Sequence, residues 1–246
     1  PKHGYGQIAE ATADAIGRDR IRTGARITRL SHDDREIHQV TVNDDARVGV
    51  DSIVSTLPLT RVLHLLDPPP PEAVRSVAES MRFRHLRLVV LGLDRPRLTA
   101  NASLYFPERS VPFTRLYEPK NRSPHMAPDD QTVVVLERPC HPHTEAWEQS
   151  DDTLRNSAVD LLATQGFIEG DGDVVAVDHR ALPFAYPILE VGAHDKANRL
   201  KTYLDHFNNL HLLGRSARFT YTHVHNLYAR ARRLTERIAP RAKSVA

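Results

Sequence analysis

The stretch Leu212–Tyr221, LLGRSARFTY, combines residue types that can bind an anionic group. An apolar run ends at Gly214, and Arg215 follows it directly. Because glycine lacks a Cβ, a ligand can approach the backbone N–H groups of such a turn closely. A guanidinium can pair with a phosphate through two hydrogen bonds. The same spacing also fits an ordinary strand–loop–helix connection, so the pattern alone leaves both interpretations open.

A second apolar run, IVSTLPL at residues 53–59, also ends in a turn, which is built from Ser, Thr and Pro. Two apolar runs can lie side by side in a parallel sheet, and both turns then meet at one edge. Ligands of open α/β sheets bind at this carboxyl edge, where the start of the following helix offers further N–H groups. The prediction is that the two runs pair and that the turns at residues 55–58 and 214 lie together.

The remaining elements follow from hydrophobic periodicity. Helical spacing predicts helices at residues 5–16, 60–67, 71–81, 151–165, 197–207 and about 224–238. Alternation and apolar runs predict strands at residues 20–32, 36–42, 46–50, 84–94, 103–106, 112–118, 132–139, 173–189 and 209–214. Consecutive strands without a helix between residues 103 and 139 indicate an antiparallel sheet. Pro183 and Pro187 place the strand 173–189 at an edge or bend it. The order predicts a mixed α/β (α+β) fold with layers of sheet and helix.

Composition restricts the class of protein. The chain has 246 residues, of which 40% are hydrophobic and 26% are charged, so it can form one large domain or two modest ones. The Pro68–Pro71 run is the best candidate boundary. A net charge of +2 gives no broad basic field for nucleic acid. No apolar run or signal pattern predicts a transmembrane segment or secretion. The single cysteine, Cys140, suits a reducing compartment, and we expect a cytoplasmic protein.

Four stretches, in order along the chain, resemble FAD-dependent oxidoreductases of the amine oxidase superfamily. This superfamily includes flavin amine oxidases, protoporphyrinogen oxidase, carotenoid desaturases and UDP-galactopyranose mutase. The stretches are PKHGYGQIAEATADAI at 1–16, IRTGARITRL at 21–30, VDSIVSTLPL at 50–59 and LHLLGRSARFTYTHVHNLYARA at 210–231. The family's G-x-G-x-x-G dinucleotide fingerprint is absent. His3 stands where the family usually has glycine, and His225 stands where the family often has aspartate. The chain therefore looks like a C-terminal portion whose G-x-G-x-x-G unit would lie upstream of Pro1.

The resemblance implies FAD as the cofactor and a division into two domains. Residues 1–67 and 208–246 would be the remainder of a Rossmann-like FAD-binding domain, and residues 68–207 a substrate-binding domain with an antiparallel sheet. The positions implied to contact the cofactor are Ile27, Thr56, Leu57, Pro58, Gly214, Arg215, Phe219 and Tyr221. Tyr186 matches a position near the substrate pocket. No catalytic acid or base is assigned, because the flavin carries the redox chemistry.

Three functions remain open at this stage. The resemblance favours transfer of a hydride from a small organic substrate to the flavin. The GR-x-A-x-F-x-Y ending also resembles the mutase branch, in which a flavin-dependent isomerase acts on a nucleotide sugar. The third alternative is a non-catalytic remnant that lacks the cofactor-binding unit and serves as a binding or assembly module. The oligomeric state is left open.

Other chemistry-bearing residues favour ordinary structural roles. Zinc sites need four ligands at defined spacings, and the sequence Cys140-His141-Pro142-His143 has no second cysteine to complete one, so no metal is predicted. His223 and His225 alternate as they would on one face of a strand. A hydrolase would need two carboxylates at a defined separation, and Glu118, Glu137 and Glu190 are scattered. The C-terminal arginines at 230, 233 and 237, followed by Arg241 and Lys243, form a basic face that we expect to be solvated surface.

Overall fold

The computed structural model describes residues 1–238; Arg241 and Lys243 of the basic tail lie outside the described residues. The chain forms two compact units, and each is described by itself. The first unit comprises Pro1–Thr23 and Arg84–Ala185, and the second comprises Gly24–Phe83 and Tyr186–Ala246.

The second unit contains a four-stranded sheet with the strand order β3-β2-β1-β5. Its strands are β1 (Ile27–His32), β2 (Ile37–Val42), β3 (Ala46–Gly49) and β5 (Leu66–Asp67). β1, β2 and β3 pair antiparallel as a meander, which confirms the three strands predicted here, and β5 joins β1 in parallel. Asn43 and Asp44 both have positive φ between β2 and β3, as a tight hairpin turn requires.

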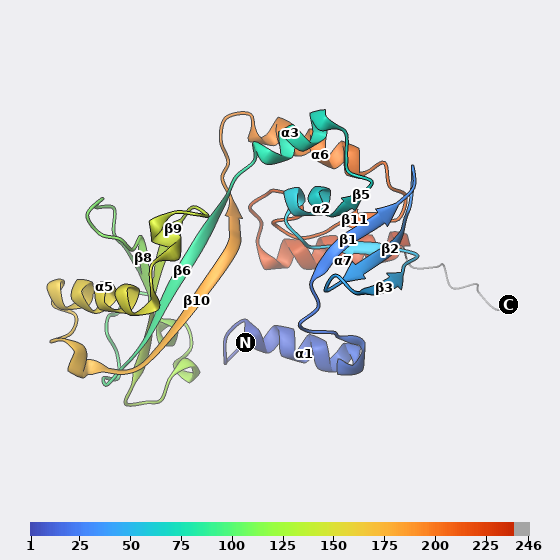
Figure 1. Ribbon diagram of the computed structural model, residues 1–246. Coiled ribbons are helices and arrows are strands. Elements are labelled where there is room, and N and C mark those ends of the chain that lie inside the picture. Colours follow the sequence, from blue (N-terminus) through green and yellow to red (C-terminus); the bar gives the residue numbers. More distant parts are fainter. Residues whose placement is uncertain (239–246) are drawn as a thin grey trace. The chain divides into compact units, whose positions relative to one another are not determined.

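Among the described residues of this unit, the elements that complete it are four helices and a second, smaller sheet, whose arrangement Figure 1 shows. The helices are α2 (Leu59–Leu65), α3 (Glu72–Glu79), α6 (Ala193–Leu204) and α7 (Val224–Ile238). The small sheet consists of β4 (Ile53–Ser55) and β11 (Leu210–Leu212). α2 and α6 supply fully buried leucines to one core, which also takes in strand residues of both sheets. Burial of each such side chain contributes about 1.5–3 kcal/mol, so this core holds the two sheets together.

The first unit contains a five-stranded sheet with the order β10-β6-β9-β8-β7. Its strands are β6 (Phe83–Leu93), β7 (Ser103–Tyr105), β8 (Arg115–Tyr117), β9 (Thr132–Cys140) and β10 (Val174–Pro187). β7, β8 and β9 pair antiparallel in sequence, and β6 pairs antiparallel with β9, which confirms the predicted antiparallel sheet. β10 lies at the edge, as its two prolines indicated.

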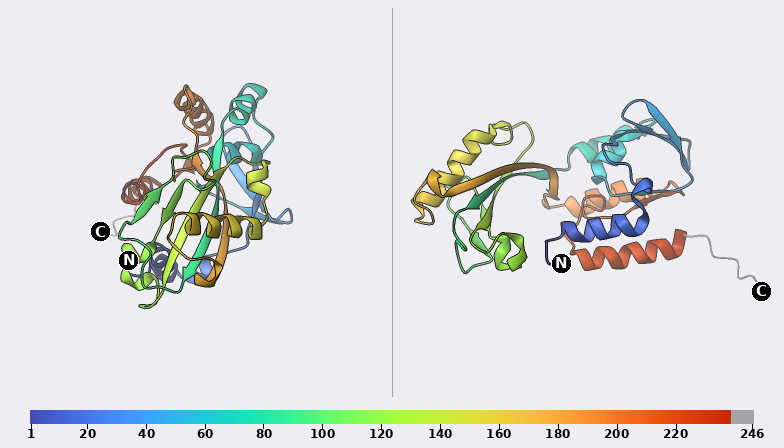
Figure 2. Two further views of the ribbon diagram at one scale, coloured as in Figure 1. Left: turned by 90° about the vertical axis from the view of Figure 1, so that its left-hand side faces the viewer. Right: turned by 90° about the horizontal axis from the view of Figure 1, so that it is seen from below.

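Several helical segments belong to the first unit. They are α1 (Gly6–Ile16), α4 (Glu145–Glu148), α5 (Asp151–Thr164) and the 3₁₀ turns η1 (Arg18–Arg20), η2 (Pro119–Asn121), η3 (Pro124–Met126) and η4 (Asp171–Asp173). α5 lies across one face of the sheet (Figure 2). The buried residues of this contact are Val89, Leu91 and Leu93 of β6, Val134 and Leu136 of β9, and Leu154, Ala158, Leu161 and Leu162 of α5. The strand residues alternate and the helix residues recur every three or four positions, so each element presents one apolar face.

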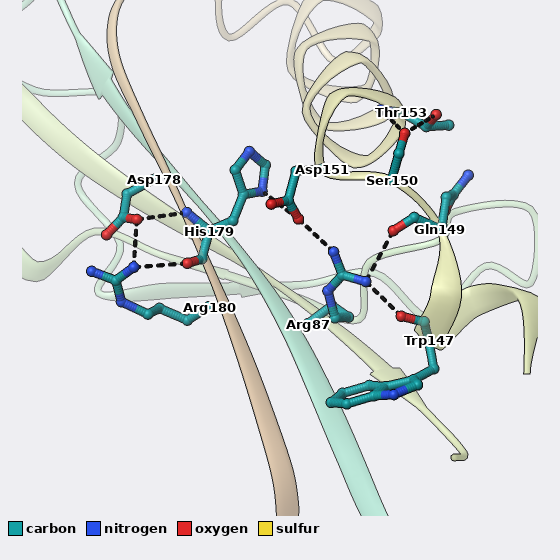
Figure 3. Close-up of polar contacts among 9 residues, drawn as sticks. All are labelled: Arg87, Trp147, Gln149, Ser150, Asp151, Thr153, Asp178, His179 and Arg180. Carbon is teal, nitrogen blue, oxygen red and sulfur yellow. Dashed lines mark hydrogen bonds and ion pairs between the residues drawn. The ribbon is translucent and has the colours of Figure 1, made fainter. Parts of the chain in front are cut away.

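Arg87 of β6 anchors the start of α5 (Figure 3). Its largely buried guanidinium donates to the carbonyl oxygens of Trp147 and Gln149 at 2.5 and 3.0 Å, and to the Asp151 carboxylate at 2.5 Å. Ser150 caps the helix, because its hydroxyl accepts a hydrogen bond from the Thr153 N–H at 3.2 Å. The buried charge is therefore fully paired, and it fixes where the helix begins.

Glu118 is a fully buried carboxylate that ties together three parts of the first unit. It accepts hydrogen bonds from the backbone N–H groups of Leu98 and Thr99 at 2.9 and 3.0 Å. The Thr132 hydroxyl donates to it at 2.6 Å, and the Asn121 amide donates at 2.9 Å. These contacts give Glu118 a structural role.

The other two glutamates considered for a hydrolase site form ion pairs: Glu137 with Arg115, and Glu190 with Arg82. None of the three carboxylates therefore pairs with another.

We expect Glu118→Ala to lower the free energy of unfolding of the first unit by about 3 kcal/mol, because buried donors lose their acceptor. The only tryptophan in the sequence, Trp147, belongs to this unit, so its fluorescence in a urea titration measures the effect. The matched control is Glu108→Ala, which changes an exposed glutamate of the same unit and should cost no more than about 0.5 kcal/mol. Equal stability of the two variants would contradict the structural role of Glu118.

Candidate functional site

The two turns singled out by the sequence lie together in the second unit. β4 and β11 pair in parallel, with Ile53 opposite Leu210 and Ser55 opposite Leu212, which confirms the predicted pairing. Beyond the strands, the Leu213 N–H donates to the Ser55 carbonyl at 3.0 Å. The Leu59 N–H, at the start of α2, donates to the Ser216 carbonyl at 3.0 Å. Hydrogen bonds therefore run in both directions between the 55–58 turn and the 213–216 turn.

Gly214 occupies a position that favours glycine. Its φ is +107°, a conformation that residues with a Cβ rarely adopt. A Cβ built at Gly214 would lie 3.7 Å from the Cβ of Thr56, so the bare backbone of one turn faces the side chain of the other. The glycine in this motif is therefore explained by backbone geometry at the junction of the two turns.

The turn after β11 also carries backbone donors without acceptors. Within residues 1–238, the N–H groups of Gly214, Arg215 and Ala217 donate no hydrogen bond. Ala217 is fully buried, whereas Gly214 is half-buried and Arg215 is exposed. Backbone N–H groups are strong donors that proteins rarely leave unpaired. The donors at Gly214 and Arg215 suit a ligand that offers oxygen or nitrogen acceptors.

Tyr221 links Arg215 to the predicted substrate residue Tyr186. The guanidinium carbon of Arg215 lies 6.0 Å from the centroid of the Tyr221 ring, within reach of a cation–π contact. The Tyr221 hydroxyl donates to the Pro187 carbonyl at 3.1 Å, and the Tyr186 and Tyr221 rings are 6.1 Å apart. An exposed cation and two phenol rings therefore gather beside the paired turns.

The other predicted contact residues are placed differently. Phe219 is buried and meets the ring of Phe83 edge-on, with centroids 5.1 Å apart. Leu57 and Ile27 pack against the same hydrophobic core, and Ile27 stands opposite Val42 at the start of β1. Pro58 precedes α2, and its carbonyl accepts the Val62 N–H. The structure therefore brings Thr56, Gly214, Arg215, Tyr221 and Tyr186 into linked contacts and sets Phe219, Leu57 and Ile27 into the core.

Sequence reasoning missed the residues that tie these turns together. Ser216 and Pro187 act through backbone carbonyl oxygens, which receive the Leu59 N–H and the Tyr221 hydroxyl. Every residue type carries a carbonyl, so no sequence pattern could have identified them.

The Cys140–His143 segment starts at the last residue of β9 in the first unit. The Cys140 thiol is buried and donates to the His85 carbonyl at 3.8 Å. Burial raises the pKa of the Cys140 thiol, which disfavours the nucleophilic thiolate. Across residues 1–238, no three or more His, Cys, Asp or Glu side chains are grouped as metal ligands.

His223 and His225 do not share a strand face, because α7 begins at Val224, as the predicted helix did, and takes His225 into its first turn. Their rings stack instead, with centroids 5.7 Å apart. In the part of the chain that the structure describes, no helix is long and apolar enough to cross a membrane.

One family model matches almost the whole chain, and solved structures share its fold. The family model described as "Flavin containing amine oxidoreductase" matches residues 1–239. Among solved structures, reduced UDP-galactopyranose mutase has a TM-score of 0.74 and 18% identity, covering 89% of this chain and 47% of that one. A putative protoporphyrinogen oxidase from Exiguobacterium sp. 255-15 has a TM-score of 0.72 and 18% identity, covering 96% and 51%. A putrescine oxidase triple mutant has a TM-score of 0.67 and 16% identity, covering 98% and 54%.

The structural likenesses concern the fold, and the chain spans about half the length of the solved structures it matches. No curated protein sequence matches the chain.

His85, next to Cys140 in the sheet, should make the stability of the first unit depend on pH. It is buried against Trp147 and Phe184, and its Nδ1 has no hydrogen-bond partner within residues 1–238. Burial lowers the pKa of His85, and nearby His141 and His143 lower it further. Since the unfolded chain then binds a proton more readily, stability should fall as the pH drops below about 6.5.

The measurement is urea unfolding, followed by Trp147 fluorescence, at several pH values between 7.5 and 5. His85→Phe removes the titrating group and should flatten the pH dependence, whereas His125→Gln changes an exposed histidine of the same unit and should leave it unchanged. A His85→Phe variant that keeps the full pH dependence would contradict this assignment.

Proposed function

Because the chain belongs to the family of flavin-containing amine oxidoreductases, we propose that it binds FAD and serves the oxidation of a small organic substrate. The observation that carries the proposal is the parallel pairing of β4 and β11, which sets the Thr56 and Gly214 turns side by side. The unpaired N–H groups of Gly214 and Arg215 fit a flavin or phosphate, both of which offer acceptor atoms.

The proposed roles of the residues follow from their chemistry. A bound flavin supplies the redox chemistry by accepting a hydride from the substrate. Gly214 leaves room for close approach, and its N–H and that of Arg215 donate to the cofactor. The exposed Arg215 guanidinium, beside the Tyr221 ring, would pair with a phosphate oxygen. Tyr186 and Tyr221 offer aromatic surface to a substrate. Their rings contact each other, so both could face the same bound substrate.

The proposal also assigns flavin binding and substrate binding to different parts of the chain. We assign the flavin side to residues 1–67 and 208–246, and the substrate side to residues 68–207. The chain carries no G-x-G-x-x-G fingerprint, so the groups that hold the FAD pyrophosphate in its relatives have no counterpart in the sequence given. A cytoplasmic location is likewise proposed, on the single cysteine.

A mutase-like isomerase is the second candidate. The GR-x-A-x-F-x-Y ending supports it, as does the fold likeness to UDP-galactopyranose mutase. In this case the substrate is a nucleotide sugar, and flavin chemistry causes no net oxidation. Titration with UDP-galactose separates the two candidates, since an amine-oxidising enzyme has no reason to bind a uridine diphosphate sugar.

We expect Arg215→Ala to weaken FAD binding about tenfold, which corresponds to about 1.4 kcal/mol and lies near the value of a charge-assisted hydrogen bond. The side chain is exposed, so the variant should keep the thermal stability of the wild type. Flavin fluorescence during titration of the protein gives the dissociation constant.

Arg47→Ala is the matched control, because Arg47 is an exposed arginine on β3 of the same unit. It should bind FAD as the wild type does. Unchanged affinity in Arg215→Ala would remove Arg215 from the site. Absence of saturable FAD binding by the folded wild-type chain would overturn the flavin proposal and favour a non-catalytic binding module.

A further inference from the structure

Four arginines converge on one pocket of the second unit, which adjoins the Gly214 turn but is lined by other residues. The pocket has a volume of about 270 Å³. Arg218 comes from the turn after β11, and Arg230, Arg233 and Arg237 come from successive turns of α7. Three leucines, at the end of β11 and on α7, form the apolar part of the lining. Thr56, Gly214 and Arg215 are not among the lining residues.

The four guanidinium groups lack anionic partners. Within residues 1–238, none of them lies within 4 Å of a carboxylate. Arg232 of the same helix differs, because it faces Glu236 at 3.8 Å. Arg218 is half-buried and the three arginines of α7 are exposed, whereas Arg87 and Arg115 of the first unit are paired with carboxylates. An unpaired group of like charges in a depression is a feature that an anion would stabilise.

The arginines also affect the pKa values of two neighbouring basic residues, Lys201 and His211. Burial lowers the pKa of Lys201 on α6, and Arg218 and Arg230 lower it further, while Asp205 acts in the opposite direction. Burial lowers the pKa of His211 on β11, and Arg237 lowers it further. Arg218, Arg230 and Arg237 thus act on titratable groups of α6 and β11, and Asp205 opposes them at Lys201.

We propose that this pocket binds a small ligand that carries two or more linked phosphate groups. The planar fork of arginine matches phosphate oxygens in pairs, and several forks can share one diphosphate. The volume suits a small ligand, since pockets for larger ones span about 300–1,000 Å³. The leucines can contact an apolar part of an organic phosphate.

The geometry favours a small ligand over a membrane surface or a nucleic acid. Leu227, Leu234 and Ile238 of α7 are half-buried in the unit, so the helix does not offer a free apolar face for insertion into lipid. The net charge of +2 gives no extended basic field along which a nucleic acid could lie.

Calorimetric titration with inorganic pyrophosphate at constant ionic strength tests the proposal. The wild-type chain should bind saturably, with one pyrophosphate per chain. Arg230→Gln combined with Arg233→Gln should weaken binding at least tenfold. Arg232→Gln removes a charge from the same helix outside the pocket, and it should change affinity no more than about twofold.

Several results would overturn the proposal. They are absence of saturable binding at millimolar pyrophosphate, an equal loss in Arg232→Gln, or binding to anionic phosphatidylglycerol vesicles or duplex DNA without binding to pyrophosphate. Displacement of pyrophosphate by FAD would assign the arginines to the cofactor and overturn a separate site. Circular dichroism of the double variant shows whether it is folded, and Arg237→Gln alone, at an exposed helix position, gives a second measurement of the same pocket.

Discussion

The pairing of β4 with β11 is the constraint on which the candidate site depends. Each strand has three residues, and they come from distant parts of the chain. Such a short parallel pair has little stability of its own. Its register therefore depends on the core supplied by α2 and α6. The leucines of these helices that are almost completely buried are Leu59, Leu63, Leu200 and Leu204. The site and the core of the second unit are therefore one cooperative structure, and damage to the core would also separate the turns.

The sequence predicted those features that a repeating pattern or a special backbone residue encodes. Alternation and turn residues located the β1–β3 meander, Pro183 located the edge strand, and Gly214 with the apolar runs located the paired turns. The hydrogen bonds that lock the site could not be predicted, because Ser216 contributes a backbone carbonyl. Glu118 resembled any other scattered carboxylate, since two of its donors, Leu98 and Thr99, lie in a loop whose course no periodicity reveals.

The net charge of +2 does not show which arginines are paired with carboxylates and which are not. In the first unit, Arg87 and Arg115 neutralise carboxylates and fix loops and strands, so their charges serve the fold. In the second unit, the arginines around the α7 pocket have no such partners within residues 1–238. This contrast separates structural guanidinium groups from those available for a ligand. Both kinds are arginine in the sequence, so only their partners in the folded chain distinguish them.

The edge position of β10 bears on how copies of the protein behave in concentrated solution. An unpaired edge with exposed valines, such as Val175 and Val177, is a template on which another chain could add a strand. The middle of β10 carries the charged pair Asp178 and Arg180, and Pro183 has no N–H to offer a neighbour. A foreign strand would meet charge and an interrupted row of donors, so the primary structure of β10 protects the sheet against edge-to-edge aggregation.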